Sequence, residues 1–271
     1  MFWRRLLSSV ILLAVTITVT LIGELPLILA LSIISIIGLF ELYRVMGIEK
    51  SLIAIFCYIA AAAYDAVIFF VGLSYNWIYF ALLLIAFLMI YVFTYPRLHI
   101  KEIVGAFFGI FYVVFTLSFI YLTRSLNAGM IIVWLIFLSA WGSDTLAYCT
   151  GMLIGKHKMS PNLSPKKSVE GLIGGIVGAI ILGALFVIIF KDSFDKVFNN
   201  SFLAVGIIML ISSAISVVGD LAASAIKRNY DIKDYGNIIP GHGGILDRFD
   251  SIIITAPTVY LLIIFLVILG V

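Results

Sequence analysis

The sequence predicts an all-α integral membrane protein, a polytopic bundle of about nine transmembrane helices. Its 271 residues are 63% hydrophobic and only 11% charged, with a mean hydropathy of +1.23. Soluble domains carry roughly 25% charged residues, so an ordinary soluble domain is excluded. The apolar runs are continuous over about 20 residues and lack the alternation of membrane barrel strands. We therefore expect one membrane domain over residues 1–271.

Nine apolar runs predict the helices in chain order. The first follows the basic pair Arg4 and Arg5 and is too long for a signal-peptide core, so we expect it to be retained as a helix. The sixth and eighth runs each contain an aspartate. We expect residues 1–125 to form lipid-facing scaffold helices and residues 126–271 to carry the catalytic helices and loops. The expected spans are 6–22, 26–43, 51–73, 76–95, 103–122, 129–155, 169–190, 202–226 and 251–270.

The distribution of lysine and arginine predicts the orientation. With a cytoplasmic N-terminus, 14 of the 17 basic residues fall in cytoplasmic segments. We expect an integral protein of the cell (inner or plasma) membrane. The loops 156–168 and 227–250 then face the cytoplasm, which places a polar site at the cytoplasmic end of the C-terminal half.

The segment 224–250 carries unusual polarity between two apolar runs. Its 27 residues include four basic residues, four aspartates, one histidine and four glycines. Charge near a bilayer is costly, so this density indicates a functional site. The glycine-rich turn at 240–244 suits phosphate, because its backbone amides are exposed beside cations. Asp247 and Asp250 share a face at the start of the last helix, where helix capping is the alternative role.

Two further aspartates lie inside predicted helices. Asp144 shares its helix face with the small residues Ala147 and Gly151, which would let another helix or a ligand approach closely. The alternative is a buried aspartate bonded to a neighbouring hydroxyl. Asp220 shares a face with Ser224 and Lys227, and this aspartate–lysine pair has a purely structural alternative.

The loop 155–171 contributes cations. It holds four lysines and two Ser-Pro steps, and Ser168 is the expected N-cap of the next helix. Lys166 and Lys167 lie at that helix start, where positive charge opposes the helix dipole and needs an anionic partner. Glu170 is one candidate partner. Carboxylates, cations and a glycine turn together indicate magnesium-dependent phosphoryl or nucleotidyl transfer.

Residues 224–250 resemble the signature of the phosphatidate cytidylyltransferases (CDP-diacylglycerol synthases). The pattern is S-x-hydrophobic-K-R, four residues, K-D, and then P-x-H-G-G-hydrophobic-x-D-R-hydrophobic-D. The segments D-T-x-A-Y from Asp144 and S-P-K-K-S-x-E-G from Ser164 are similar to a second block of that family. The resemblance covers roughly the C-terminal half, and the N-terminal helices match it only in hydropathy.

The resemblance implies that CTP and phosphatidic acid react to give CDP-diacylglycerol and pyrophosphate. It also implies that the reaction requires Mg²⁺, either as one or two ions or together with a second cation. The metal ligands it implies are Asp220 and Asp247 first, then Asp144 and Asp250. The catalytic set it implies is Asp144, Asp220, Asp247, Lys167, Lys227, Arg228 and Arg248. The substrate-binding set it implies is Lys166, Ser224, Lys233, His242, Gly243 and Gly244.

Other functions stay open at this point. A transporter or channel would also carry intramembrane aspartates, and Asp65 in the third helix fits that class better. Another CTP-using lipid enzyme, such as a polyprenol kinase, would share the nucleotide chemistry, whereas a structural scaffold would not need the aspartates. We expect membrane lipids but no nucleic acid as partners. The glycines between 171 and 178 predict close helix packing within the protomer, with a homodimer face as the alternative.

Overall fold

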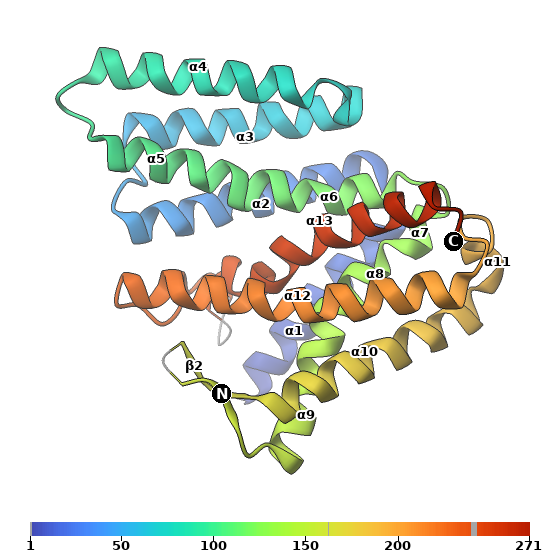
Figure 1. Cartoon of the computed structure of the whole chain (residues 1–271). Helices are drawn as coiled ribbons and strands as arrows, with labels where there is room; N and C mark the ends of the chain where they lie inside the picture. Colours follow the sequence, from blue (N-terminus) through green and yellow to red (C-terminus); the bar gives the residue numbers. More distant parts are fainter. Residues whose placement is uncertain (1, 162, 240–242) are drawn as a thin grey trace. The chain divides into compact units, whose positions relative to one another are not determined.

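The computed structural model describes residues 2–161, 163–239 and 243–271, and the chain forms two compact units (Figure 1). The first unit comprises residues 1–122 and 232–248, and the second comprises residues 123–231 and 249–271. The chain passes from the first unit to the second after Leu122. The predicted division at residue 125 into scaffold and catalytic parts stays a prediction. The return of residues 232–248 to the N-terminal helices was not expected from the sequence. The single membrane domain stays a prediction.

Glycine and serine residues mark the ends of the helices in the first unit. Gly47 ends α2 in the left-handed conformation, with φ of 74°, and Ser51 caps α3 by accepting the Ala54 N–H. Gly72, with φ of 68°, starts the 3₁₀ turn that reverses the chain. The elements are α1 (Phe2–Ile22), α2 (Glu24–Met46), α3 (Leu52–Val71), η1 (Gly72–Tyr75), α4 (Asn76–Thr94), α5 (Ile100–Gly109), the π-helical η2 (Ile110–Phe115) and α6 (Thr116–Arg124), whose last residues enter the second unit.

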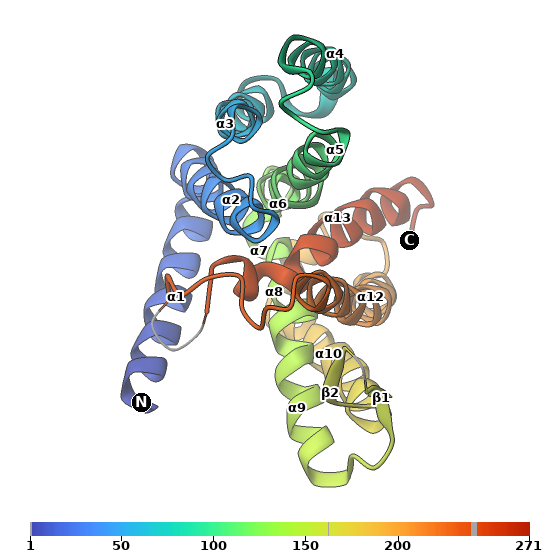
Figure 2. The same ribbon diagram turned by 90° about the vertical axis from the view of Figure 1, so that its left-hand side faces the viewer.

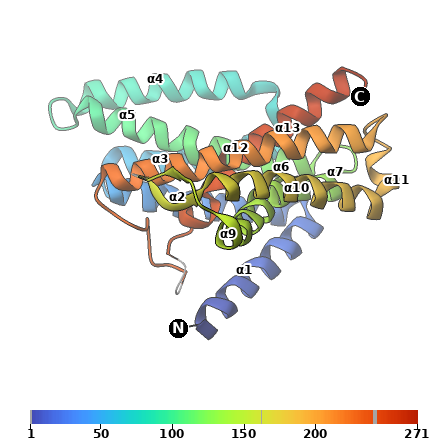
Figure 3. The same ribbon diagram turned by 60° about the horizontal axis from the view of Figure 1, so that its bottom comes forward.

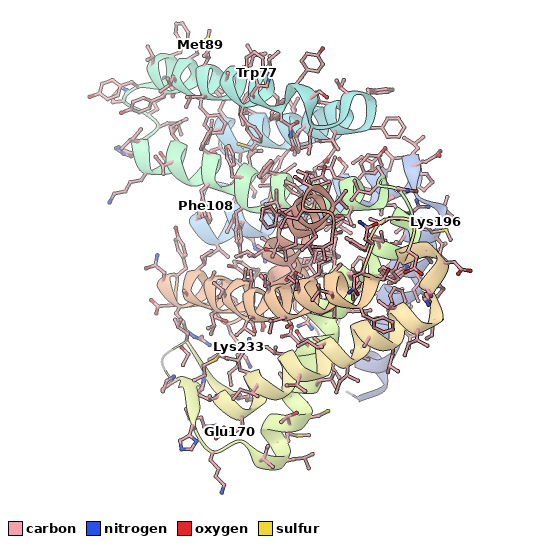
Figure 4. The ribbon with its side chains drawn as sticks, turned by 45° about the vertical axis from the view of Figure 1, so that its right-hand side comes forward. Trp77, Met89, Phe108, Glu170, Lys196 and Lys233 are labelled. Carbon is pink, nitrogen blue, oxygen red and sulfur yellow. The ribbon has the colours of Figure 1, made fainter. Side chains whose placement is uncertain are left out.

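Aromatic side chains form the core between α3, α4, α5 and η2, which lie side by side in Figure 1. The rings of Phe80 and Phe111 stack with centroids 4.4 Å apart, and Phe115 meets Phe80 edge to face. On the opposite face of α4, Trp77 and Met89 project outward and are exposed (Figure 4). This division between a packed inner face and an apolar outer face suits a helix that contacts lipid.

The second unit contains the remaining helices and a small hairpin. The predicted span 129–155 is not one regular helix, because it is interrupted at Val133 and by a π-helical turn. Gly142 in that turn lies against Leu182, so a larger residue would press on the neighbouring helix. The elements are α7 (Gly129–Ile132), α8 (Trp134–Phe137), η3 (Leu138–Gly142), α9 (Ser143–Ile154), β1 (Lys158–Ser160), β2 (Ser164–Ser168), α10 (Val169–Ile189), α11 (Lys191–Phe194), α12 (Ser201–Asn229) and α13 (Leu246–Ile268), which begins in the first unit.

Helix α10 packs closely on α9 through its glycines (Figure 2). A side chain on Gly174 would collide with Thr150, and one on Gly175 would meet Ala147. Helix α12 lies along another side of α10 (Figure 3). The glycine face therefore serves helix packing within the protomer, as the first of the two interpretations predicted.

The hairpin is a correction to the purely helical prediction. Residues 158–160 and 164–168 form two short antiparallel strands with Lys158 opposite Ser168 and Ser160 opposite Ser164. Along β2, Lys166 is exposed while Lys167 is partly buried. Both lysines thus precede α10 on a strand and do not lie in its first turn.

Seven helical stretches in the described chain are long and apolar enough to cross a membrane. One of these stretches, 52–94, consists of α3 and α4 joined by η1. In α1, the apolar stretch Val10–Ile22 is shorter than these seven. The structure is therefore that of a polytopic helical membrane protein, whereas the count of nine spans stays a prediction.

Candidate active site

Three aspartates from three helices of the second unit interact electrostatically. Asp144 lies in the first turn of α9, Asp220 in the last third of α12 and Asp250 in the first turns of α13. The charge of Asp250 interacts with those of both Asp220 and Asp144. We call Asp144, Asp220 and Asp250 the carboxylate cluster. Sequence reasoning selected all three, and the fold brings them together.

Small residues allow these helices to approach one another. A side chain on Gly219 would lie 2.9 Å from the carbonyl oxygen of Asp250, so only glycine lets α12 pass this close to α13. The hydroxyls of Ser143 and Ser216 are 3.3 Å apart between α9 and α12. Asp144 and Asp220 each directly follow one of these contacts, Asp144 after Ser143 and Asp220 after Gly219. The close packing of these helices therefore fixes the backbone positions of Asp144 and Asp220.

Lys167 forms an ion pair with Asp220 and also interacts with the charge of Asp144. The side chains of Lys167 and Asp220 are both about three-quarters buried, at 23% and 25% exposure. Ser224 donates a weak hydrogen bond of 3.4 Å to the same aspartate, as the shared helix face predicted. The anionic partner expected for Lys167 is thus Asp220, and Glu170 does not fill that role.

The other two members of the cluster have partners on neighbouring elements. Lys227 interacts with the charge of Asp250, one helix away, and its expected pairing with Asp220 stays a prediction. Asp144 is hydrogen bonded to the side chain of Ser251. The alternative in which Asp144 bonds a hydroxyl is therefore present, together with its electrostatic interaction with Lys167.

Glu170 holds the base of the hairpin that carries Lys167. Its carboxylate accepts the Lys156 N–H at 3.0 Å and lies 2.5 Å from the His157 Nδ1 atom. Ser168 caps α10 by accepting the Gly171 N–H at 3.1 Å, as predicted. Figure 4 labels Glu170 at this end of α10. Both interactions lie at the base of the hairpin, where β2 ends next to Lys167.

The first unit contains a second group of carboxylates, around the glycine-rich segment. Asp247 is buried, and its Oδ2 atom accepts the N–H groups of Tyr235 at 2.8 Å and Gly244 at 2.9 Å. The fully buried Glu41 on α2 accepts the N–H groups of Ile245 at 3.1 Å and Leu246 at 2.8 Å. Both of these bonds of Asp247 go to chain that precedes α13, so helix capping, the alternative considered for Asp247, stays a prediction. Its role as a metal ligand stays a prediction.

Glu41 and Arg44 were missed by sequence reasoning. Arg44 donates to the Tyr235 carbonyl oxygen at 2.6 Å from the turn of α2 that follows Glu41. The signal was available in the sequence: Glu41 is an acidic residue within the apolar run 26–43, where an uncompensated charge is costly. We call Glu41, Arg44 and Asp247 the loop anchor.

The hydrogen bonds of the loop anchor limit the predicted use of the glycine turn as a phosphate site. The amides of Gly244, Ile245 and Leu246 already donate to carboxylates. Phosphate could use these amides only after displacing Asp247 or Glu41. Gly243 has φ of 86°, which favours glycine, and a side chain there would meet Asp247. Gly243 and Gly244 therefore both have a role in the structure of this segment. Substrate binding by these two glycines stays a prediction.

The remaining predicted site residues are distributed over both units. Lys166, Arg228 and Lys233 are exposed, and Figure 4 labels Lys233 on the loop of the first unit. Arg248 is partly buried in the first turn of α13. His242 lies outside the described residues. Lys227 and Arg228 occupy the last turn of α12, where cations also favour the helix dipole.

The carboxylate cluster has the donor chemistry of a magnesium site. Within the described ranges, no three His, Cys, Asp or Glu side chains form a group that could hold a metal ion on their own. Mg²⁺ does not require one, because it usually takes one or two carboxylates, several waters and substrate phosphates. The cluster therefore fits a metal that is completed by its substrate.

These features define an integral membrane protein whose polar site combines helix-borne carboxylates with lysines. The chain belongs to the cytidylyltransferase family, whose model matches residues 3–266. It is 30% identical to the phosphatidate cytidylyltransferase of Bacillus subtilis over 96% of this chain and 97% of that protein.

Two staphylococcal relatives match over a shorter region. The chain is 36% identical to the phosphatidate cytidylyltransferase of Staphylococcus saprophyticus over 55% of either chain. It is 37% identical to that of Staphylococcus aureus over 56% of either chain. These two alignments thus span about half the length of the relatives they match.

Proposed function

We propose that the protein is a phosphatidate cytidylyltransferase, which transfers CMP from CTP to phosphatidic acid and releases CDP-diacylglycerol and pyrophosphate. Membership of the cytidylyltransferase family and the name shared by its relatives support this activity. The observation that carries the proposal is the ion pair of Lys167 and Asp220 beside Asp144. A membrane scaffold would have no need to keep such partly buried charges together.

The reaction needs positioning and charge stabilisation more than it needs a base. An oxygen of the phosphatidic acid phosphate forms a bond to the α-phosphorus of CTP, and the bond from that phosphorus to the bridging oxygen of pyrophosphate breaks. The attacking phosphate is already anionic near neutral pH. Charge on the transferring group is therefore what the protein must stabilise.

The predicted site residues have distinct tasks in this proposed mechanism. Lys167, placed by the hairpin, and Lys227, on α12, neutralise phosphate oxygens. Arg228 and Arg248 are proposed to bind the triphosphate or the departing pyrophosphate. Asp144, Asp220 and Asp250 are proposed to hold Mg²⁺, with Asp247 as a further candidate. The metal, when bound, would neutralise charge on the phosphates of CTP.

The membrane setting suits one lipid substrate and one soluble substrate. The positive-inside distribution supports a cytoplasmic N-terminus and cytoplasmic loops 156–168 and 227–250, where CTP is available. Phosphatidic acid would enter from the bilayer. A homodimer is not needed for this arrangement, because the glycine face of α10 already packs on α9.

The test is pyrophosphate release by the purified protein in detergent with CTP, phosphatidic acid and Mg²⁺, omitting each component in turn. We expect release that requires all three, with a CDP-lipid as the second product. Release of CDP with a newly phosphorylated lipid would instead identify a lipid kinase. No release from folded protein would contradict the proposal, and other lipid phosphates would then be tested as acceptors.

A further inference from the structure

We propose that Glu41 is a positioning residue for the reaction: its carboxylate sets residues 244–246 at the start of α13, and it is the reason that residues 236 and 244 are glycine. The inference deepens the proposed function and rests on it. Helix α2 lies outside the region where the signature resemblance was found. Its role was expected to be that of a scaffold only.

The hydrogen bonds of Glu41 to the backbone fall on two adjacent residues, Ile245 and Leu246. Both carboxylate oxygens accept backbone N–H groups, one from Ile245 and one from Leu246. These are the amides at the start of α13, where helices leave N–H groups without intrahelical partners. The negative charge of Glu41 also lies at the N-terminal end of α13, where it interacts favourably with the helix dipole. A residue 200 positions earlier in the chain thus provides the cap of this helix.

The fit around the carboxylate explains two glycines. At Gly244, all three nearest atoms that an added side chain would meet belong to the Glu41 carboxyl group. At Gly236, the two nearest atoms belong to the same group. Neither glycine has a positive φ, so backbone conformation does not require glycine at these positions. The requirement comes from Glu41, which makes it testable by substitution.

Glu41 acts together with its neighbours in the loop anchor. Arg44 binds the Tyr235 carbonyl oxygen, and Asp247 binds the Tyr235 and Gly244 N–H groups. The bonds of Glu41 fall on the two residues that directly precede Asp247 and Arg248. Losing them would free the turn from which these two predicted site residues project. We therefore expect a loss of turnover and not only a loss of folded protein.

A double-mutant cycle tests the pairing directly. Gly244→Ala is expected to lower kcat/KM by about tenfold or more in the otherwise unaltered protein, because the new methyl group collides with Glu41. In the Glu41→Ala background, the same change is expected to have almost no further effect. Glu41→Gln, which keeps one acceptor oxygen, should retain more turnover than Glu41→Ala. Activities are to be expressed per folded protein, from size-exclusion chromatography and thermal unfolding in detergent.

Two matched controls separate this pairing from general damage. Gly219→Ala, which would press on the Asp250 carbonyl oxygen, should cost the same factor in both backgrounds. Glu102→Gln alters another carboxylate at a helix start of the first unit, where Glu102 accepts the His99 N–H. It should leave turnover unchanged.

A readout independent of activity is hydrogen–deuterium exchange of the amides at 244–246. Exchange should quicken in Glu41→Ala but not in Glu102→Gln. Equal effects of Gly244→Ala in both backgrounds, or unchanged exchange, would overturn the inference. An inactive but folded wild-type protein would instead count against the proposed function, and the exchange experiment would still decide the role of Glu41.

Discussion

The carboxylate cluster of the second unit and the loop anchor of the first differ in what their carboxylates face. In the loop anchor, Glu41 and Asp247 each accept two backbone N–H groups. In the carboxylate cluster, Asp144, Asp220 and Asp250 interact with one another and with lysines. Like charges meet in both groups, because Glu41 also repels Asp247. In the loop anchor, four backbone N–H groups and Arg44 stabilise them, whereas in the carboxylate cluster lysines face them.

This difference separates structural from chemical use of the same side chain. A buried carboxylate that is fully hydrogen bonded to amides holds the chain in place, and replacing it disturbs the fold. Carboxylates that repel one another have a cost that a bound cation would offset. Both groups consist of acidic side chains between helices, so their partners are what distinguishes them.

The largest effect should come from Asp220→Asn, which removes charge from the centre of the carboxylate cluster and from the ion pair with Lys167. We expect turnover to fall by about 100-fold or more while the protein stays folded, because charge stabilisation supplies most of the rate. The measurement is pyrophosphate release together with thermal unfolding in detergent. Near-normal turnover would remove Asp220 from the proposed metal ligands.

Lys167→Met should have the next largest effect. Methionine keeps the length of the side chain but leaves Asp220 without its ion-pair partner and takes away a proposed phosphate ligand. We expect a loss of turnover of about 10- to 100-fold, with a higher KM for CTP. Lys166→Met is the matched control, because the neighbouring side chain on β2 is exposed. Equal losses in both variants would argue that the hairpin contributes only general positive charge.

How far the sequence predicted this site depends on the kind of interaction. The helical segments other than 129–155, the N-cap at Ser168 and the close packing at Gly219 follow from local patterns and are present. The aspartates could be selected because charge within an apolar run is conspicuous. Their partners could not, since the pairing of Lys167 with Asp220 depends on a hairpin that the loop composition did not indicate.

Glu41 illustrates the limit most clearly. Nothing within a few residues of it predicts that its partners lie about 200 positions later, at Ile245 and Leu246. Sequence reasoning assigned the glycines near 244 to phosphate, because glycine turns with exposed amides suit anions. The fold places carboxylates on those amides. Only the tertiary structure distinguishes a glycine that is needed for a ligand from one that is needed for a neighbouring side chain.

Asp247 belongs to the loop anchor and is also a predicted metal ligand. Two substitutions distinguish these two roles. Asp247→Ala leaves the buried amides of Tyr235 and Gly244 without their acceptor, so the free energy of unfolding should fall by about 1–3 kcal/mol. Asp247→Asn keeps an acceptor oxygen and should cost less stability. As a predicted metal ligand, Asp247 should still lose turnover in the asparagine variant. Stable and active Asp247→Asn protein would restrict this residue to the loop anchor.

The smallest expected effect compares two N-caps, one in each unit. Ser168→Ala and Ser51→Ala each remove a hydroxyl that accepts a helix N–H, at α10 and α3 respectively. Each change should lower the free energy of unfolding by about 1 kcal/mol. Only Ser168 directly follows Lys167, so only Ser168→Ala should also reduce turnover, by a few-fold. A reduction of equal size in both variants would mean that turnover follows stability alone, and would weaken the proposed role of the hairpin in placing Lys167.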